Sequence, residues 1–239
     1  MSACIVTGCA AGNGFAIAKQ LAADGHHVVG VDRTAPATGS EEWLLIGDIL
    51  DPAVRLEAFA KATAFSQGEL YLVNNAGVTV PEFPQSDLAW NTTLDINLKA
   101  PFQWSRTFAE YVSQGVIAKG GIVFIGSLAT TMAFPENPAY QASKSGITGL
   151  ARAFAFDLGR HGIRSNCVSP GYIQTAMTAR SYNTPELHEA RKRHMLLRRW
   201  GHAQDIANAV SFLCSEKASY ITGVNLPVDG GWMACGLTA

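Results

Sequence analysis

The sequence predicts a three-layer α/β fold, in which a doubly wound parallel sheet lies between two layers of helices. Strand and helix signals alternate along the whole chain of 239 residues. The strand runs are short and apolar at successive positions, as in a parallel sheet that helices cover on both faces. No internal repeat, low-complexity tract or linker interrupts the alternation, so we expect a single domain over residues 1–239.

Each element can be assigned from its local pattern. The predicted strands are Ala3–Thr7, His27–Asp32, Trp43–Gly47, Leu70–Val73, Gly121–Gly126, Arg164–Val168 and Val224–Leu226. Helices are predicted at Phe15–Ala22, 51–66, 87–115, 138–160 and 203–215. Asn137 can cap the helix that follows it, and Pro138 suits the first turn of that helix.

The stretch from Tyr172 to about Arg199 has no clean periodicity. It follows Pro170-Gly171 at the carboxyl end of a predicted strand, where ligands bind in sheets of this kind. We therefore expect residues 172–199 to form a mobile flap over the substrate.

Composition excludes several classes of function. The net charge is −1 and no basic cluster suggests nucleic acid as a partner. The sequence has no run of about 18 apolar residues, so we expect no membrane span. The first strand begins close to Met1, so we expect no signal peptide and a cytoplasmic protein. The 5 cysteines form no Cys-x-x-Cys pair and the 6 histidines show no ligand spacing, so we expect reduced thiols and no metal.

A glycine loop follows the first strand. Gly8, Gly12 and Gly14 stand between that strand and a helix, which is the context in which glycines let a backbone approach a pyrophosphate. The second strand ends in Asp32, where a carboxylate can bind the ribose hydroxyls of an adenosine and repel a 2′-phosphate. Arg33 could pair with such a phosphate, but we interpret it as stacking on adenine or facing solvent. We therefore expect NAD as the cofactor.

Tyr140 and Lys144 lie on one face of a predicted helix, at a spacing of i, i+4. A tyrosine has a pKa of about 10, roughly three units above a useful value for proton transfer at neutral pH. A lysine ammonium at about 4 Å can supply roughly the 4 kcal/mol that this gap represents. A lone Tyr-x-x-x-Lys usually means only a solvated helix face, so the rest of the chain has to support the pair.

Taken together, the motifs resemble the short-chain dehydrogenase/reductase family, in its single-domain branch with a Rossmann-type fold. They are Thr7-Gly8-x-x-x-Gly12-x-Gly14, Asn74-Asn75-Ala76-Gly77, Asn97, Ser127, Tyr140-x-x-x-Lys144 and Pro170-Gly171. The similarity extends from the first strand to Val228-Asp229-Gly230-Gly231.

The resemblance implies a set of site residues. The catalytic residues would be Asn97, Ser127, Tyr140 and Lys144. The cofactor-binding residues would be Gly8, Asn13, Gly14, Phe15, Asp32, Arg33, Asp48, Ile49, Asn75, Ala76, Gly77, Tyr140, Lys144, Pro170, Gly171, Ile173 and Thr175. By the same resemblance, Asn97 would kink the long helix and hold a water that exchanges protons with Lys144.

The resemblance implies an NAD-dependent oxidoreductase that interconverts a secondary alcohol and a ketone, with Tyr140 as general acid and base. A sensor or scaffold that binds NAD without turnover stays open as an alternative. Substrate candidates are a sugar, polyol or sugar acid, a 3-hydroxyacyl compound and a hydrophobic alcohol. The residues expected to line the substrate site are Leu128, Met132, Phe134, Gln141, Tyr172 and Met177.

Two features of the sequence leave further questions open. The flap is basic, and one of its arginines could bind an anionic group of the substrate, although charge runs usually face solvent. They are Arg180, Arg191, Arg193, Arg198 and Arg199. Relatives pack the helices that match 87–115 and 138–160 against a neighbouring copy, so the resemblance also implies a homotetramer.

Overall fold

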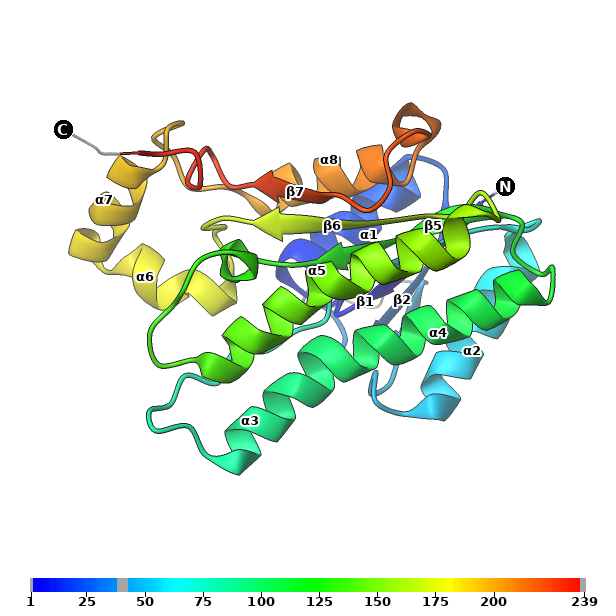
Figure 1. Cartoon of the computed structure of the whole chain (residues 1–239), viewed down its shortest axis with the longest axis horizontal. Coiled ribbons are helices and arrows are strands. Elements are labelled where there is room, and N and C mark those ends of the chain that lie inside the picture. Colours follow the sequence, from blue (N-terminus) through cyan, green and yellow to red (C-terminus); the bar gives the residue numbers. More distant parts are fainter. Residues whose placement is uncertain (1, 38–42, 237–239) are drawn as a thin grey trace.

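The computed structural model describes residues 2–37 and 43–236, and its strands form a single parallel sheet (Figure 1). The seven strands follow the order β3-β2-β1-β4-β5-β6-β7. They are β1 (Ala3–Thr7), β2 (His27–Asp32), β3 (Leu44–Ile46), β4 (Glu69–Asn74), β5 (Lys119–Ile125), β6 (Arg164–Pro170) and β7 (Asn225–Val228). Each predicted strand is present, so the predicted parallel sheet is confirmed.

Helices cover both faces of this sheet. They are α1 (Gly12–Ala23), α2 (Pro52–Phe65), α3 (Asp87–Leu94), α4 (Ala100–Ser113), α5 (Pro138–Gly159), α6 (Ala179–Asn183), α7 (Pro185–His194) and α8 (Ala203–Leu213). Successive side chains of a strand point to opposite faces, so Ile5 packs with α2, α4 and α5 while Val6 packs with α1 and α8. The predicted three-layer α/β fold is confirmed.

The order of the strands places a ligand-binding edge between β1 and β4. The chain winds from β1 to β2 and β3 on one side and then returns to pair β4 with the other side of β1. The loops after β1 and β4 therefore diverge above the sheet, and this switch point is where open α/β sheets bind ligands. In Figure 1, α6 and α7 (yellow) lie at the end of the molecule toward which the strand arrows point.

The helix predicted over 87–115 is interrupted by a wider turn. Residues Asp95–Lys99 form a π-helical segment between α3 and α4. The buried side chain of Asn97 accepts a hydrogen bond from Val78 N at 2.8 Å and donates one to Val78 O at 2.8 Å. Such wide turns often mark functional sites, and this one is fixed by a contact 19 residues away.

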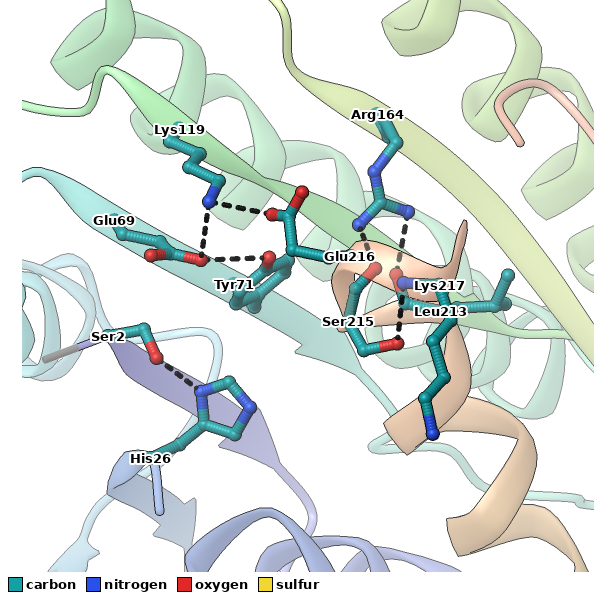
Figure 2. A network of polar contacts seen from close by, with 10 residues as sticks. All are labelled: Ser2, His26, Glu69, Tyr71, Lys119, Arg164, Leu213, Ser215, Glu216 and Lys217. Atoms are coloured by element: carbon teal, nitrogen blue, oxygen red, sulfur yellow. Dashed lines mark hydrogen bonds and ion pairs between the residues drawn. The ribbon is translucent and has the colours of Figure 1, made fainter. Parts of the chain in front are cut away.

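A polar network lies at the opposite end of the sheet, where the strands begin (Figure 2). Lys119 pairs with Glu216 at 2.7 Å and with Glu69 at 3.8 Å. Arg164 donates hydrogen bonds to the carbonyl oxygens of Leu213 at 2.7 Å and Ser215 at 3.3 Å. These bonds satisfy free carbonyls at the end of α8, where a positive charge also favours the helix dipole.

Candidate active site

A cavity of about 750 Å³ opens at the carboxyl edge of the sheet. It extends from the glycine loop after β1 to the helices α6 and α7, and residues of the loops after β4, β5 and β6 line it. The sequence-predicted residues Ser127, Tyr140 and Lys144 lie in this cavity together with the glycine loop.

The glycine loop leaves no room for side chains. Gly8 has a φ of +68°, and a Cβ there would lie 2.7 Å from the Cα of Ala76. A Cβ on Gly14 would lie 2.0 Å from the carbonyl oxygen of Gly8. Asn13 lines the cavity at the start of α1, and its buried Oδ1 has no hydrogen-bond partner among the described residues. A glycine cradle at a helix N-terminus fits the pyrophosphate of a dinucleotide. The Asn13 Oδ1 is an acceptor, so it suits a donor such as a ribose hydroxyl and not a phosphate oxygen.

Asn75 joins the two halves of the site. Its Nδ2 donates to Thr7 O at 3.0 Å and to Gly8 O at 2.8 Å, and the Thr7 hydroxyl accepts from Asn75 N at 3.1 Å. Asn74 points the other way and donates to Ser105 Oγ at 3.1 Å. The motif Asn74-Asn75-Ala76-Gly77 is therefore structural, and Asn75, Ala76 and Gly77 also line the cavity.

Two carboxylates lie at the glycine-loop end of the cavity. The Asp32 carboxylate accepts hydrogen bonds from Ala10 N at 2.9 Å and Thr34 N at 3.3 Å, which hold it beside the loop. Arg33 is exposed and lines the cavity without pairing to Asp32. Asp48 accepts from Leu50 N at 2.9 Å. Ile49 lines the cavity next to it, although its carbonyl oxygen is already bound by Trp104 Nε1 at 2.9 Å.

The predicted acid–base residues come from β5 and α5. Ser127 follows β5, and its Oγ accepts from Ala129 N at 3.2 Å. Tyr140 and Lys144 lie in the first turns of α5, which Asn137 caps through its Oδ1 and which Pro138 begins, as predicted. The Lys144 ammonium lies 5.8 Å from the centre of the Tyr140 ring and donates to Ile125 O at 2.8 Å.

Burial dominates the ionisation of these residues. It raises the pKa of Tyr140, and a hydrogen bond with Ser127 acts in the opposite direction. Burial also lowers the pKa of Lys144 to about 8. That Lys144 lowers the pKa of Tyr140 stays a prediction, because the two shifts seen here come from burial and from Ser127.

Two predicted site residues do not present their side chains to the cavity. Phe15 packs 6.3 Å from the Trp43 ring, measured between centroids, with Lys19 over its face. Asn97 uses its amide on the backbone of Val78, as described above, and also donates to Ser143 Oγ at 3.3 Å. A Cβ added to Gly77 would lie 3.3 Å from Asn97 Oδ1 and 3.6 Å from Lys144 Nζ, so Asn97 lies close behind the site. Its role in proton exchange stays a prediction.

The far end of the cavity is formed by the segment after β6. Pro170, Gly171, Ile173 and Thr175 line it, as predicted. Thr175 faces the glycine loop, since a Cβ on Gly12 would lie 3.4 Å from its methyl group. Within residues 172–199 the chain forms a short 3-10 helix (Ala176–Thr178), α6 and α7.

The end of the cavity where the substrate was expected contains both predicted and unpredicted residues. Leu128, Phe134, Tyr172 and Met177 line the cavity. Met132 does not line it, and Gln141 instead donates to Ala129 O at 2.6 Å. Sequence reasoning missed the lining residues Val78, Thr79, Pro81, Ile96, Pro135 and Ser181. Several of these follow β4 directly, so their place after a predicted strand was a usable signal.

The described residues hold no group of three or more His, Cys, Asp and Glu side chains that could bind a metal ion. Within residues 2–37 and 43–236, no helix is long and apolar enough to cross a membrane. Cys9, in the glycine loop, is fully buried, and burial raises the pKa of its thiol to about 12, so it is not a reactive thiolate.

The chain is similar to known proteins over almost its whole length. A family model described as enoyl-(acyl carrier protein) reductase matches residues 8–233. The human dehydrogenase/reductase SDR family member 4 is 34% identical over 241 residues, which cover 95% of this chain and 86% of the relative.

Two solved structures are similar over nearly the whole chain. An Agrobacterium tumefaciens protein provisionally assigned as a 2-deoxy-D-gluconate 3-dehydrogenase, with bound NADP, is 35% identical with a TM-score of 0.88, over 98% of this chain and 96% of its own. A 4-hydroxyisoleucine dehydrogenase complexed with NADH is 30% identical with a TM-score of 0.88, over 98% of this chain and 99% of its own.

Proposed function

Since this chain belongs to the short-chain dehydrogenase/reductase family, we propose that it is an NAD-dependent oxidoreductase that interconverts a secondary alcohol and a ketone. The observation that carries this proposal is the shared cavity. Ser127, Tyr140 and Lys144 line one part of it, and the glycine loop with Asp32 lines another. A dinucleotide held by the loop would therefore extend toward the three reactive side chains.

The chain's own residues have distinct roles in this mechanism. A bound nicotinamide supplies hydride acceptance or donation at carbon. Tyr140 takes the proton of the substrate hydroxyl during oxidation and returns it during reduction. Ser127 donates a hydrogen bond to the substrate oxygen and stabilises the charge that develops there. Lys144 adds a positive charge that favours the Tyr140 phenolate, against the burial that raises the pKa of the phenol.

The choice of NAD over NADP is supported by charge. The Asp32 carboxylate is fixed by two backbone N–H groups at the end of β2, where the adenosine ribose would lie. A 2′-phosphate at about 5 Å would be opposed by about 3 kcal/mol per unit charge at an effective dielectric near 20. The described lining residues near Asp32 offer one cation, Arg33, which is exposed.

The alternative of a non-catalytic NAD sensor is disfavoured by the same set of side chains. A protein that only binds the dinucleotide has no use for a serine and a buried lysine beside a tyrosine in the cavity. The substrate candidates are a sugar, polyol or sugar acid, a 3-hydroxyacyl compound or a hydrophobic alcohol. The name of the Agrobacterium tumefaciens relative refers to a gluconate derivative, which supports the sugar-acid class.

The test is NADH formation on a panel of sugars, sugar acids, hydroxyacyl esters and aryl alcohols, with wild type and Tyr140→Phe. We expect turnover of at least one class by the wild type and a loss of at least 1000-fold in kcat for the variant, with NADH affinity within threefold. No turnover on any alcohol or ketone, combined with tight NADH binding, would support the sensor. A variant that keeps more than a few per cent of kcat would remove Tyr140 from its role.

We further propose that the enzyme is a cytoplasmic homotetramer and that residues 172–199 close over the substrate. The outward faces of α4 and α5 support the tetramer, because Phe102 is 42% exposed and Phe156 is 87% exposed. Light scattering after gel filtration tests it. Phe156→Glu should reduce the mass by half or more, and a wild type that is monomeric at micromolar concentration would contradict the proposal.

A further inference from the structure

The cavity is asymmetric in charge. Its two carboxylates, Asp32 and Asp48, lie at the glycine-loop end. At the end formed by α6 and α7, the charged lining residues are Arg180 and Arg191. Among the described residues, neither arginine pairs with a carboxylate. The substrate end of the cavity therefore carries positive charge without a counter-ion.

Arg191 is held in place without being neutralised. Its guanidinium lies 4.8 Å from the centre of the Tyr172 ring, and its Nη1 donates to Leu187 O at 3.3 Å. Tyr172 is itself fixed by ring contacts with Trp200 at 5.5 Å and Trp232 at 4.7 Å. The Arg191 Nε is buried and has no hydrogen-bond partner among residues 2–37 and 43–236. The stacking preorganises this guanidinium, and Leu187 O takes one of the N–H donors on Nη1 and Nη2, which leaves others of that pair for a ligand in the cavity.

The other cations of this segment are used differently. Arg199 forms a two-pronged pair with Asp205 at 2.8 and 2.9 Å, which ties the segment to α8. Lys192 pairs with Glu189 at 3.7 Å on the outside of α7. Arg193 is exposed and does not line the cavity. The contrast separates Arg191 from a solvated helix face, because it alone among the described residues of α7 both stacks on an aromatic ring of the cavity and lines the cavity.

We propose that the substrate carries a carboxylate and that Arg191 binds it, with the exposed Arg180 adding positive charge at the same end of the cavity. This inference rests on the proposed function, since it places the reacting hydroxyl at Ser127 and Tyr140. A planar guanidinium with free N–H donors matches the two oxygens of a carboxylate. The substrate class is thus a hydroxy acid, whose acid group contacts α7 while its carbinol carbon faces the catalytic side chains.

Binding of succinate and of its neutral analogue succinamide to the enzyme–NADH complex tests this inference without turnover. Isothermal titration should show that succinate binds the wild type at least 10-fold more tightly than succinamide. Arg191→Met should weaken succinate binding at least 10-fold and leave succinamide and NADH unchanged. The matched control is Arg193→Met on the same helix, which should bind succinate as the wild type does. The proposal would be overturned if Arg191→Met bound succinate within twofold of the wild-type affinity, or if the wild type bound succinate and succinamide equally tightly.

Turnover then separates this inference from the function on which it rests. With a 3-hydroxy acid and its amide as substrates, Arg191→Met should raise KM for the acid at least 10-fold and change kcat less than threefold. Arg191-dependent succinate binding without oxidation of any alcohol would keep the anion site and remove the oxidoreductase function. If the enzyme oxidised neutral alcohols and bound succinate equally well with and without Arg191, the proposed function would stand and the anion site would be refuted.

Discussion

Replacing Gly14 with alanine should damage both stability and cofactor binding, although alanine is the better helix former. The new Cβ would lie 2.0 Å from Gly8 O and 2.4 Å from Asn75 Nδ2. Gly8 O belongs to the backbone, so the glycine loop and α1 have to move apart. That movement weakens the hydrogen bonds from Asn75 to Thr7 O and Gly8 O, which join β4 to β1.

The magnitude follows from three contributions. Overpacking against backbone costs about 1–3 kcal/mol. Loss of the two Asn75 hydrogen bonds costs about 1 kcal/mol each. Alanine has a higher helix propensity than glycine, which offsets about 1 kcal/mol of this destabilisation. Gly14→Ala should therefore lower the free energy of unfolding by about 2–4 kcal/mol.

Gly159→Ala is the matched control, because Gly159 is an exposed helical glycine and a Cβ placed there would meet no described atom within 4 Å. It should raise the free energy of unfolding by about 0.5 kcal/mol. Urea unfolding at one protein concentration measures both, and NADH fluorescence should show at least 10-fold weaker binding for Gly14→Ala alone. Equal stability of Gly14→Ala and wild type, or an equal loss in Gly159→Ala, would refute the reasoning.

Three other substitutions test the charges of the molecule. Asp32→Ser should raise the ratio of kcat/KM with NADP to that with NAD at least 10-fold, and a ratio unchanged in steady-state assays would contradict the role of the carboxylate. Lys144→Met should abolish turnover yet stabilise the fold at pH 7 by about 2 kcal/mol, because burial lowers the lysine pKa to about 8 from 10.5. Between pH 8 and 10.5 the unfolded wild type binds more protons than the folded one, so its free energy of unfolding should rise with pH. The difference in stability between Lys144→Met and wild type should therefore narrow by pH 9.5, and a difference that widens in urea unfolding would be inconsistent with this reasoning. Arg164→Met should lower Tm by about 3–6 °C through the lost contacts at the end of α8, with NADH affinity unchanged.

The fold was largely predictable because local patterns agree with the tertiary structure. The runs at Ala3–Thr7 and His27–Asp32 form strands with the predicted bounds. Other ends shifted, as where β6 continues to Pro170 instead of ending at Val168. The π-helical segment was not predictable from local preference, since the distant backbone of Val78 holds Asn97 in it.

The candidate site was predictable where a backbone or a reactive group had to occupy a given place. The glycines, Ser127, Tyr140 and Lys144 all line the cavity. Side-chain direction was harder to predict, because Phe15 turned toward Trp43. The balance at Tyr140 of burial, which raises its pKa, against the hydrogen bond with Ser127, which lowers it, also depends on three-dimensional packing that no motif encodes.

The ionic cluster around Lys119 and Arg164 can be changed to alter heat tolerance without altering the residues of the candidate active site. Its members sit where the strands start, and none of them lines the cavity (Figure 2). A library of substitutions confined to that end can be selected for survival at high temperature alone, with turnover checked only once on the final variants. Engineering of substrate preference can then proceed on α6 and α7 in parallel, and the two sets of changes should combine additively.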